Sequence, residues 1–292
     1  MDASESELAA AAQAARQASD FLLLERLGRE LVVRGESAGN RVTTAWGNYH
    51  LGIALASLNR GPEAAEATRI AIALFEQSGE RFAAARAMMN LGIAELDING
   101  NALEAQRLFD LSMPVVRELG APINVGIALG NLGEIYRHQG DFRRALVYAE
   151  ESLALFRVLD DPHNVVWQLM NVAHYEHRLR RYKSAAAHMG EAHELLRAHP
   201  NPRWLAWYFD LWFLFSADLN RLTIAAKLHA FAEKYRTEHV QPRSHAMTMW
   251  LSAATERVAR DLSTDAYETL VKEGESLTVE SAQQLIEEKG TS

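Results

Sequence analysis

The spacing of histidines is the first place to look for chemistry in this chain. His188, Glu191 and His193 come close to the zinc-binding arrangement His-x-x-Glu-His, and His174 and His177 are three residues apart. His188 and His193 are five residues apart, so they point to different faces of a helix with 3.6 residues per turn. Zinc needs three or four ligands with supporting hydrogen bonds. The sequence therefore predicts no metal site and no cofactor.

Catalytic motifs are missing as well. The chain has no cysteine, which excludes disulfides, thiolate nucleophiles and cysteine-ligated zinc. It also has no phosphate-binding loop of the G-x-x-x-x-G-K-[ST] type, no G-x-S-x-G elbow and no G-x-G-x-x-G string. Acidic neighbours such as Glu150 and Glu151 point about 100° apart on a helix and do not converge as an acid and a base. We therefore expect a protein that is not an enzyme.

The elements that carry these residues are revealed by an internal repeat. The strings His50-Leu51-Gly52, Asn90-Leu91-Gly92, Asn131-Leu132-Gly133 and Asn171-Val172-Ala173 start 40, 41 and 40 residues apart. A period of this length, with two helices per period, predicts an all-α, right-handed superhelical solenoid. Prolines are expected to open the helical segments, and five of them fit this role: Pro62, Pro122, Pro162, Pro202 and Pro242.

One unit shows the local pattern most clearly. Leu132-Gly133, Tyr136, the turn Gly140-Asp141-Phe142 and Ala145 resemble the tetratricopeptide pattern L-G-x2-Y…A. Small residues at Gly133 and Ala145 allow the two helices of a pair to approach closely. The period is longer than the usual 34 residues, so the resemblance is to a long variety of this repeat.

The repeat sets the expected domain organisation. Residues 1–41 should form a degenerate N-terminal helix pair, and residues 241–292 a helix with a divergent cap. The tetratricopeptide-like pairs between them are expected at 42–79, 81–120, 122–160, 162–200 and 202–240. Within the cap, we expect five apolar residues to face inward: Leu262, Tyr267, Leu270, Leu277 and Leu285.

The first helix of each pair should line a concave groove. Positions that follow an i, i+4, i+7, i+11 rule share one face of a helix, and the recurring Asn lies on that face. An Asn side chain has two donors and one acceptor, which suits the backbone of an extended peptide; alternatively, it satisfies a neighbouring helix. Trp46 and His50 occupy the same positions in an earlier pair. The predicted groove residues are Arg86, Asn90, Asn131, Glu134, His138, Trp167, Asn171, His174, Arg178 and Trp207.

A dense aromatic run on the first helix of the fifth pair leaves two interpretations open. Its members lie between Trp204 and Phe215, and one interpretation is a helix enclosed by its neighbours. In the other, Trp167 and Trp207, one repeat apart, line an apolar pocket for a small molecule.

The C-terminal sequence carries a second resemblance. The string Ala225–Glu233, Leu262, Tyr267 and the string Gly274–Ala282 resemble the ending of large bacterial signal-transduction NTPases that regulate transcription, of the maltose-activator and antibiotic-regulator type. The resemblance implies the tetratricopeptide sensor half of such a regulator, here without the NTPase and DNA-binding parts. His229-Ala230-Phe231 departs from the small residues that are usual there.

Composition limits the partners. The formal net charge of −8 disfavours nucleic acid, and the basic run at Arg178–Lys183 fits a solvated turn. The acidic, Ala-rich start is unlike a secretory signal, so we expect a cytoplasmic protein with no membrane partner. The expected function is binding of a protein or peptide in the groove, as the sensing part of a bacterial regulatory protein. A free-standing adaptor and a small-molecule sensor remain alternatives.

Overall fold

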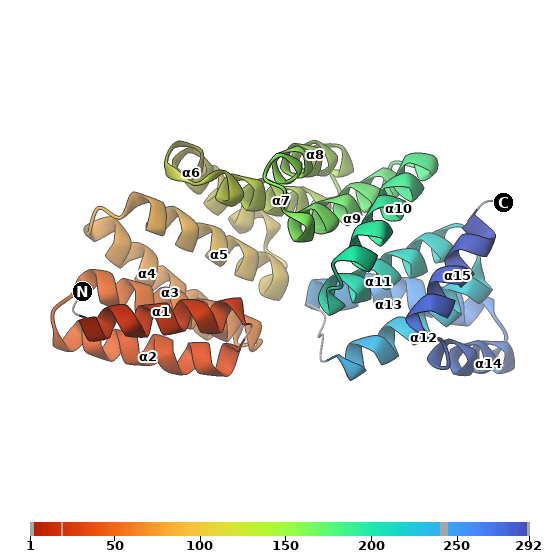
Figure 1. Cartoon of the computed structure of the whole chain (residues 1–292), viewed down its shortest axis with the longest axis horizontal. Helices are drawn as coiled ribbons and strands as arrows, with labels where there is room; N and C mark the ends of the chain where they lie inside the picture. Colours follow the sequence, from red (N-terminus) through yellow and green to blue (C-terminus); the bar gives the residue numbers. More distant parts are fainter. Residues whose placement is uncertain (1–2, 19, 240–244, 291–292) are drawn as a thin grey trace. The chain divides into compact units, whose positions relative to one another are not determined.

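The computed structural model describes residues 3–18, 20–239 and 245–290, apart from some side chains near helix ends, and these residues form fifteen α-helices and no strand (Figure 1). In chain order they are α1 (Ala3–Gln17), α2 (Phe21–Ser37), α3 (Arg41–Ser57), α4 (Gly61–Gln77), α5 (Arg81–Asn99), α6 (Ala102–Leu119), α7 (Pro122–His138), α8 (Phe142–Val158), α9 (Pro162–Arg178), α10 (Tyr182–Ala198), α11 (Pro202–Asp218), α12 (Leu222–Glu238), α13 (His245–Asp261), α14 (Thr264–Glu275) and α15 (Val279–Gly290). None of the described helices has the length and apolar character needed to cross a membrane.

Left-handed residues close many of the helices at regular intervals. Gly39, Asn59 and Gly79 all have positive φ and follow one another at steps of 20 residues, which is one helix and one turn. Glycine adopts this conformation without steric cost, and Asn tolerates it better than other residues. Arg180, with φ of 61°, occupies the same kind of position. Two such steps make the 40-residue period of the sequence.

Four of the prolines begin helices. A proline lies in the first turn of α4, α7, α9 and α11, where its missing N–H costs nothing. Pro242 lies outside the described residues. Pro114, in contrast, lies inside α6, where it removes a hydrogen bond from the helix ladder.

The helices group into two compact units, and the division falls within α8. We call residues 1–155 the N-terminal unit and residues 156–292 the C-terminal unit. In the N-terminal unit, α2 packs closely on α3 through glycines. A Cβ atom on Gly47 would lie 2.6 Å from the backbone nitrogen of Val32, and one on Gly28 would lie 3.1 Å from the carbonyl oxygen of Gly47. The two backbones are therefore in direct contact.

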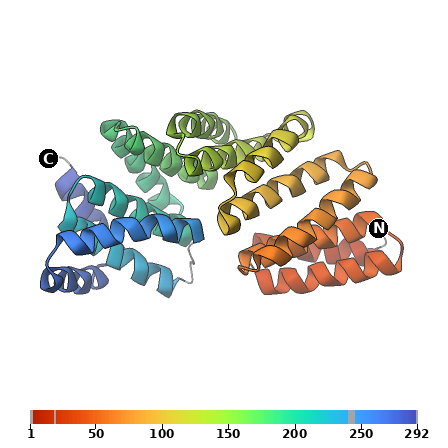
Figure 2. The same ribbon diagram turned by 180° about the vertical axis from the view of Figure 1, so that it is seen from behind.

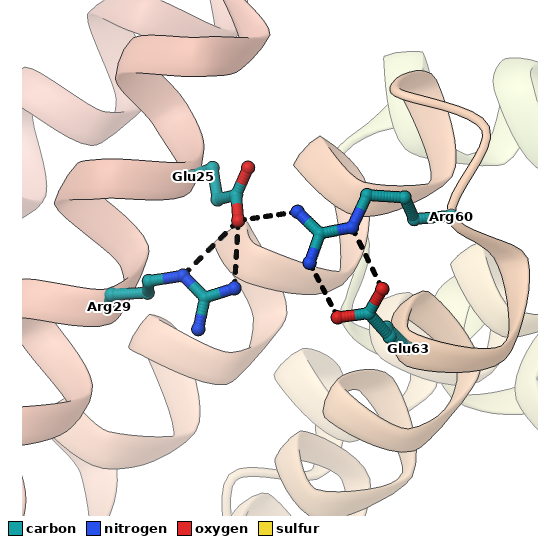
Figure 3. A network of polar contacts seen from close by, with 4 residues as sticks. All are labelled: Glu25, Arg29, Arg60 and Glu63. Carbon is teal, nitrogen blue, oxygen red and sulfur yellow. Dashed lines mark hydrogen bonds and ion pairs between the residues drawn. The ribbon is translucent and has the colours of Figure 1, made fainter.

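An arginine–glutamate network also joins α2 to the start of α4 (Figure 3). Oε1 of Glu25 accepts hydrogen bonds from Nη2 of Arg29 at 2.8 Å and from Nη1 of Arg60 at 2.7 Å. Arg60 also donates to both carboxylate oxygens of Glu63, at 2.8 and 2.5 Å. The hydrogen bond from Arg29 is the main reason that the pKa of Glu25 lies below its usual value. Each of the four charges thus has an opposite charge beside it.

The C-terminal unit has an aromatic core, and α14 and α15 both contact α12. Phe209 and Phe213 of α11 are fully buried, and α14 packs against α12 where Gly274 meets the backbone of Lys227. In α15, Ala282 and Ile286 are buried. The five apolar residues that we expected to face inward are only partly buried: Leu262, Tyr267, Leu270, Leu277 and Leu285.

Candidate functional site

The predicted groove residues of the N-terminal unit remain accessible. Arg86 and Asn90 of α5, and Asn131, Glu134 and His138 of α7, are all partly exposed. We call these five residues the α5–α7 face. Because they lie one or two helical turns apart on two helices that contact each other, they can present polar groups to one extended ligand.

Two polar contacts organise the α7 half of this face. Nε of Arg137 donates to Glu134 at 2.9 Å, and Nη2 of the same guanidinium lies 2.7 Å from Nε2 of His138. Burial is the main cause that lowers the pKa of His138 to about 4, and the positive charge of Arg137 adds to it. At neutral pH the imidazole of His138 is therefore uncharged and can accept the hydrogen bond from Arg137.

A cluster of aromatic and cationic side chains lies next to Asn90. The hydroxyl of Tyr49, on α3, accepts hydrogen bonds from Nη1 of Arg16 at 3.1 Å and from Nη2 of Arg86 at 3.0 Å. The guanidinium of Arg86 also lies 5.7 Å from the ring centroid of Trp46, within the range of a cation–π interaction. Together with His50, these residues form what we call the tyrosine cluster. The sequence pattern includes Trp46, His50 and Arg86 but gives no reason to expect Arg16 or Tyr49.

In the C-terminal unit, the predicted groove residues are largely covered. Asn171 and His174 are each 1% exposed, and Trp207 is 8% exposed. The ring of Trp250, on α13, lies 4.4 Å from the imidazole of His174 and 6.1 Å from the ring of Trp207. Figure 2 shows α13 in blue, crossing the helices of this unit. Helix α13 thus covers residues that the repeat pattern places on an accessible face.

Further polar contacts hold α13 in place. Nη2 of Arg257 donates to Asp218, at the end of α11, at 2.9 Å. Asp218 also lies 3.3 Å from Nε2 of His177 and 3.9 Å from Arg178, which is exposed. Burial by itself raises the pKa of Asp218, but hydrogen bonds from His177 and Arg257 outweigh it, so the pKa lies below its usual value. The carboxylate therefore stays charged and binds α13 through Arg257.

Trp167 and Trp207 have different aromatic neighbours. Trp167 stacks on Trp204 with ring centroids 6.3 Å apart and planes 9° from parallel, whereas Trp207 packs against Trp250. A pocket with a volume of about 230 Å³ lies instead in the N-terminal unit, on the side of α5 that meets α4 and α6, with Ala84, Met88 and Leu111 in its lining. Its wall is mostly aliphatic.

The histidines that come close to a zinc motif contact separate carboxylates. Nδ1 of His188 lies 2.8 Å from Glu176, and Nδ1 of His193 lies 3.9 Å from Glu287. Within the described ranges, no group of three or more His, Asp and Glu side chains is arranged to hold a metal ion.

Sequence reasoning missed one buried ion pair. Asp210, on α11, is fully buried and pairs with Arg236 of α12, which is 9% exposed. The sequence did contain a signal for this ion pair, because Asp210 interrupts the most apolar segment of the chain. A buried carboxylate requires a charged partner, and the next helix is the natural place to look for one.

Comparison with known proteins agrees with this architecture. A family model described as tetratricopeptide repeat matches residues 84–157 and 124–198. No curated protein matches the chain. Together with the paired packing of the helices, the match shows that the fold is an all-helical solenoid of tetratricopeptide repeats.

Several solved structures share this fold at low sequence identity. A Rap protein complexed with competence and sporulation factor has a TM-score of 0.68 and 12% identity, over 96% of this chain and 74% of that one. The Rap conjugation gene regulator of plasmid pLS20, in complex with the Phr* peptide, has a TM-score of 0.61 and 16% identity, over 88% and 74% of the two chains. A signal-transduction ATPase with numerous domains and a tetratricopeptide repeat sensor, from Pyrococcus horikoshii, has a TM-score of 0.56 and 16% identity. The match covers 92% of this chain but only 45% of the ATPase.

Proposed function

We propose that this chain is a non-catalytic binding module that takes an extended peptide, or an extended loop of a partner protein, on the α5–α7 face. The observation that carries the proposal is the pair Asn90 and Asn131, which recur at the same repeat position and are both partly exposed. An amide side chain offers two donors and one acceptor, so it can bind a peptide backbone irrespective of sequence. Repeat solenoids commonly use such surfaces for binding.

The spacing of the helices suits an extended chain. Packed helices lie about 8–10 Å apart, and an extended peptide advances about 3.3 Å per residue, so one step between neighbouring helices spans about three peptide residues. Asn90 and Asn131 lie on α5 and α7, which contact each other. A peptide running across the two helices could therefore bond to one Asn and, about three residues later, to the next.

The predicted groove residues of the C-terminal unit become accessible only on one condition. Asn171 and His174 lie beneath α13, so a ligand reaches them only if α13 moves away from α9 and α11. Trp207 is covered as well, whereas Trp167 is partly exposed and Arg178 is exposed. In our proposal, the α5–α7 face of the N-terminal unit binds the peptide, and the residues under α13 take no part unless this helix moves.

The solved structures support a role in sensing. Two of the similar folds were solved in complex with competence and sporulation factor or with the Phr* peptide, and a third belongs to a signal-transduction ATPase that has a tetratricopeptide repeat sensor. The C-terminal sequence resembles sensor halves of bacterial transcriptional regulators. We therefore propose that the chain is the partner-sensing part of a bacterial regulatory protein, with a free-standing adaptor as the alternative arrangement.

A peptide library tests the binding face directly. Randomised octapeptides labelled with fluorescein are titrated with the wild-type chain and with the double variant Asn90→Ala/Asn131→Ala, and fluorescence polarisation is measured. Loss of one hydrogen bond costs about 1 kcal/mol, so we expect the double variant to bind at least tenfold more weakly. Asn124→Ala, a partly exposed site in the first turn of α7, is the matched control. Equal binding by the wild type and the double variant would rule out this face.

A further inference from the structure

The pocket of about 230 Å³ in the N-terminal unit lies between three consecutive helices, α4, α5 and α6 (Figure 1). One wall is a single face of α5, because residues three, four and seven positions apart on a helix lie on the same side. The residues of this wall are Arg81, Ala84, Ala85 and Met88. Leu111 of α6 also lines the pocket and is 54% exposed, so the pocket opens to solvent.

The pocket and the α5–α7 face lie on different sides of α5. Arg86 comes two positions after Ala84 and Asn90 two positions after Met88, and a step of two positions turns an α-helix by about 200°. A ligand in the pocket therefore leaves Arg86 and Asn90 accessible. A function of the pocket is independent of peptide binding on the α5–α7 face.

The interior of the pocket is apolar and suits a small apolar body. Ala84 and Ala85 are buried, and the remaining apolar lining comes from Met88, Leu111 and Val115. A cavity of about 150 Å³ takes one benzene molecule, so the volume here accommodates one ring with a short chain. The thioether of Met88 makes favourable contacts with an aromatic ring.

The mouth of the pocket carries negative charge. Glu76, in the last turn of α4, is exposed, and no cation of the described part of the chain lies within 4.0 Å of its carboxylate. Gly79, just after the end of α4, also lines the pocket, so the C-terminal end of this helix adds its partial negative charge. A Cβ atom on Gly79 would meet no atom within 4 Å, which leaves room there for a ligand group.

The positive charge of Arg81, also in the lining, is already balanced. Nη1 and Nη2 of Arg81 donate to the two carboxylate oxygens of Glu118 at 3.2 and 2.9 Å. Glu76 has no comparable partner within the described residues, so the mouth of the pocket retains a negative charge. This charge repels an anion and attracts a cation.

We propose that this pocket binds a small organic cation, with an apolar body against α5 and α6 and an ammonium group beside Glu76 and the end of α4. The site goes beyond the proposed peptide-binding function, because it lies on the other side of α5 and takes a different class of ligand. The ammonium group donates to the carboxylate of Glu76, and charge-assisted hydrogen bonds of this kind are stronger than neutral ones. Removal of the apolar body from water supplies the rest of the affinity.

Phenethylamine tests the site against two molecules of similar shape, the neutral phenethyl alcohol and the anion hydrocinnamate. The methionine methyl groups are isotopically labelled, and the NMR signal of Met88, assigned through Met88→Leu, is followed in each titration at pH 7. We expect a dissociation constant on the order of 1 mM for phenethylamine, as its few atoms allow. Because Glu76 is exposed, we expect a preference of about fivefold over either control molecule. The signal of Met189, buried in the C-terminal unit, should not move.

Two pairs of variants assign the two parts of the ligand. Glu76→Gln should weaken phenethylamine binding about fivefold and leave phenethyl alcohol unchanged. Glu66→Gln removes the same charge from an exposed position of α4 outside the lining and should retain the preference. Leu111→Ala should weaken both ligands, whereas Leu103→Ala, at an exposed site of α6 outside the lining, should weaken neither. The methionine spectrum without ligand verifies that each variant folds.

Three outcomes would overturn the assignment. Equal binding of phenethylamine and either control molecule would show that Glu76 does not select a cation. An unchanged Met88 signal at about 20 mM phenethylamine, well above the expected dissociation constant, would show that the pocket takes no such ligand. Binding of a capped Phe-Lys dipeptide at least tenfold more tightly than phenethylamine would show that the pocket takes side chains of a protein partner instead. None of these outcomes bears on the α5–α7 face.

Discussion

The ring of Trp250, on α13, lies 4.4 Å from the imidazole of His174, on α9, with the two planes tilted by 30°. The repeat pattern places His174 on the accessible face of a first helix, but this contact places it in the interior. The two residues are 76 positions apart in the sequence, and Trp250 lies beyond the last period of the repeat. Helix α13 therefore does more than continue the stack, because it covers part of the surface that earlier helices create.

Replacing Trp250 should expose the residues beneath it. We expect Trp250→Ala to lower the free energy of unfolding by about 2 kcal/mol, below the 3–5 kcal/mol range for a fully buried ring because Trp250 is partly exposed. His174 should then react with diethyl pyrocarbonate, which mass spectrometry can locate. Trp204→Ala is the control, since Trp204 stacks on Trp167 and is also partly exposed. A modification rate at His174 that is equal in all three proteins would contradict the covering role of α13.

The repeat could be predicted because it depends on interactions between segments that are adjacent in the sequence. The 40-residue recurrence of the Asn strings reflects packing between neighbouring helices, and the left-handed turn at Gly140 uses a residue suited to positive φ. Such requirements act on adjacent segments, so they leave a period in the sequence. The model of the tetratricopeptide repeat matches this same central region.

Contacts between segments that are distant in the sequence leave no such repeating pattern of residues. Arg16 meets Tyr49 because α1 lies against α3, and nothing in the spacing of the two residues specifies that meeting. The contact of Trp250 with His174 depends on how α13 crosses the earlier helices, where the period has already ended. Asp210 differs from these cases. A lone carboxylate in an apolar helix indicates that a charged partner lies nearby, although it does not identify that residue.

The close contact between α2 and α3 gives a test of packing. Gly47→Ala should lower the free energy of unfolding by about 2 kcal/mol or more, because the new Cβ would meet backbone atoms of Val32 and Gly28 that cannot rotate away. Gly190→Ala, at an exposed position inside α10 with no atom within 4 Å of the new Cβ, should instead raise stability by about 1 kcal/mol. Urea denaturation of both variants measures the two effects, and changes of the same sign would refute this view of the α2–α3 contact.

The buried ion pair in the C-terminal unit should be costly to break. Asp210→Asn keeps the shape of the side chain but removes the negative charge that pairs with the buried guanidinium of Arg236, for which we expect a loss of about 3–5 kcal/mol in the free energy of unfolding. Glu118→Gln removes the exposed partner of Arg81 and should lower the free energy of unfolding far less, because water and salt screen an exposed pair. Urea denaturation at pH 7 compares the two variants. Similar losses of unfolding free energy in the two variants would mean that burial adds little to the cost of breaking the Asp210–Arg236 pair.

His50 should make stability depend on pH in a definite window. Its pKa is about 4 in the folded protein and 6.5 in the unfolded chain, so between these values the unfolded state binds more protons and stability falls as pH falls. From pH 7 to pH 5 this histidine should cost about 2 kcal/mol, with no further loss below its folded pKa. His50→Gln should reduce the loss by that amount, whereas His163→Gln, at an exposed site, should retain the wild-type profile. Urea denaturation at pH steps from 4 to 8 measures all three proteins. Coinciding profiles for the wild type and His50→Gln would show that His50 takes up a proton as readily in the folded chain as in the unfolded one.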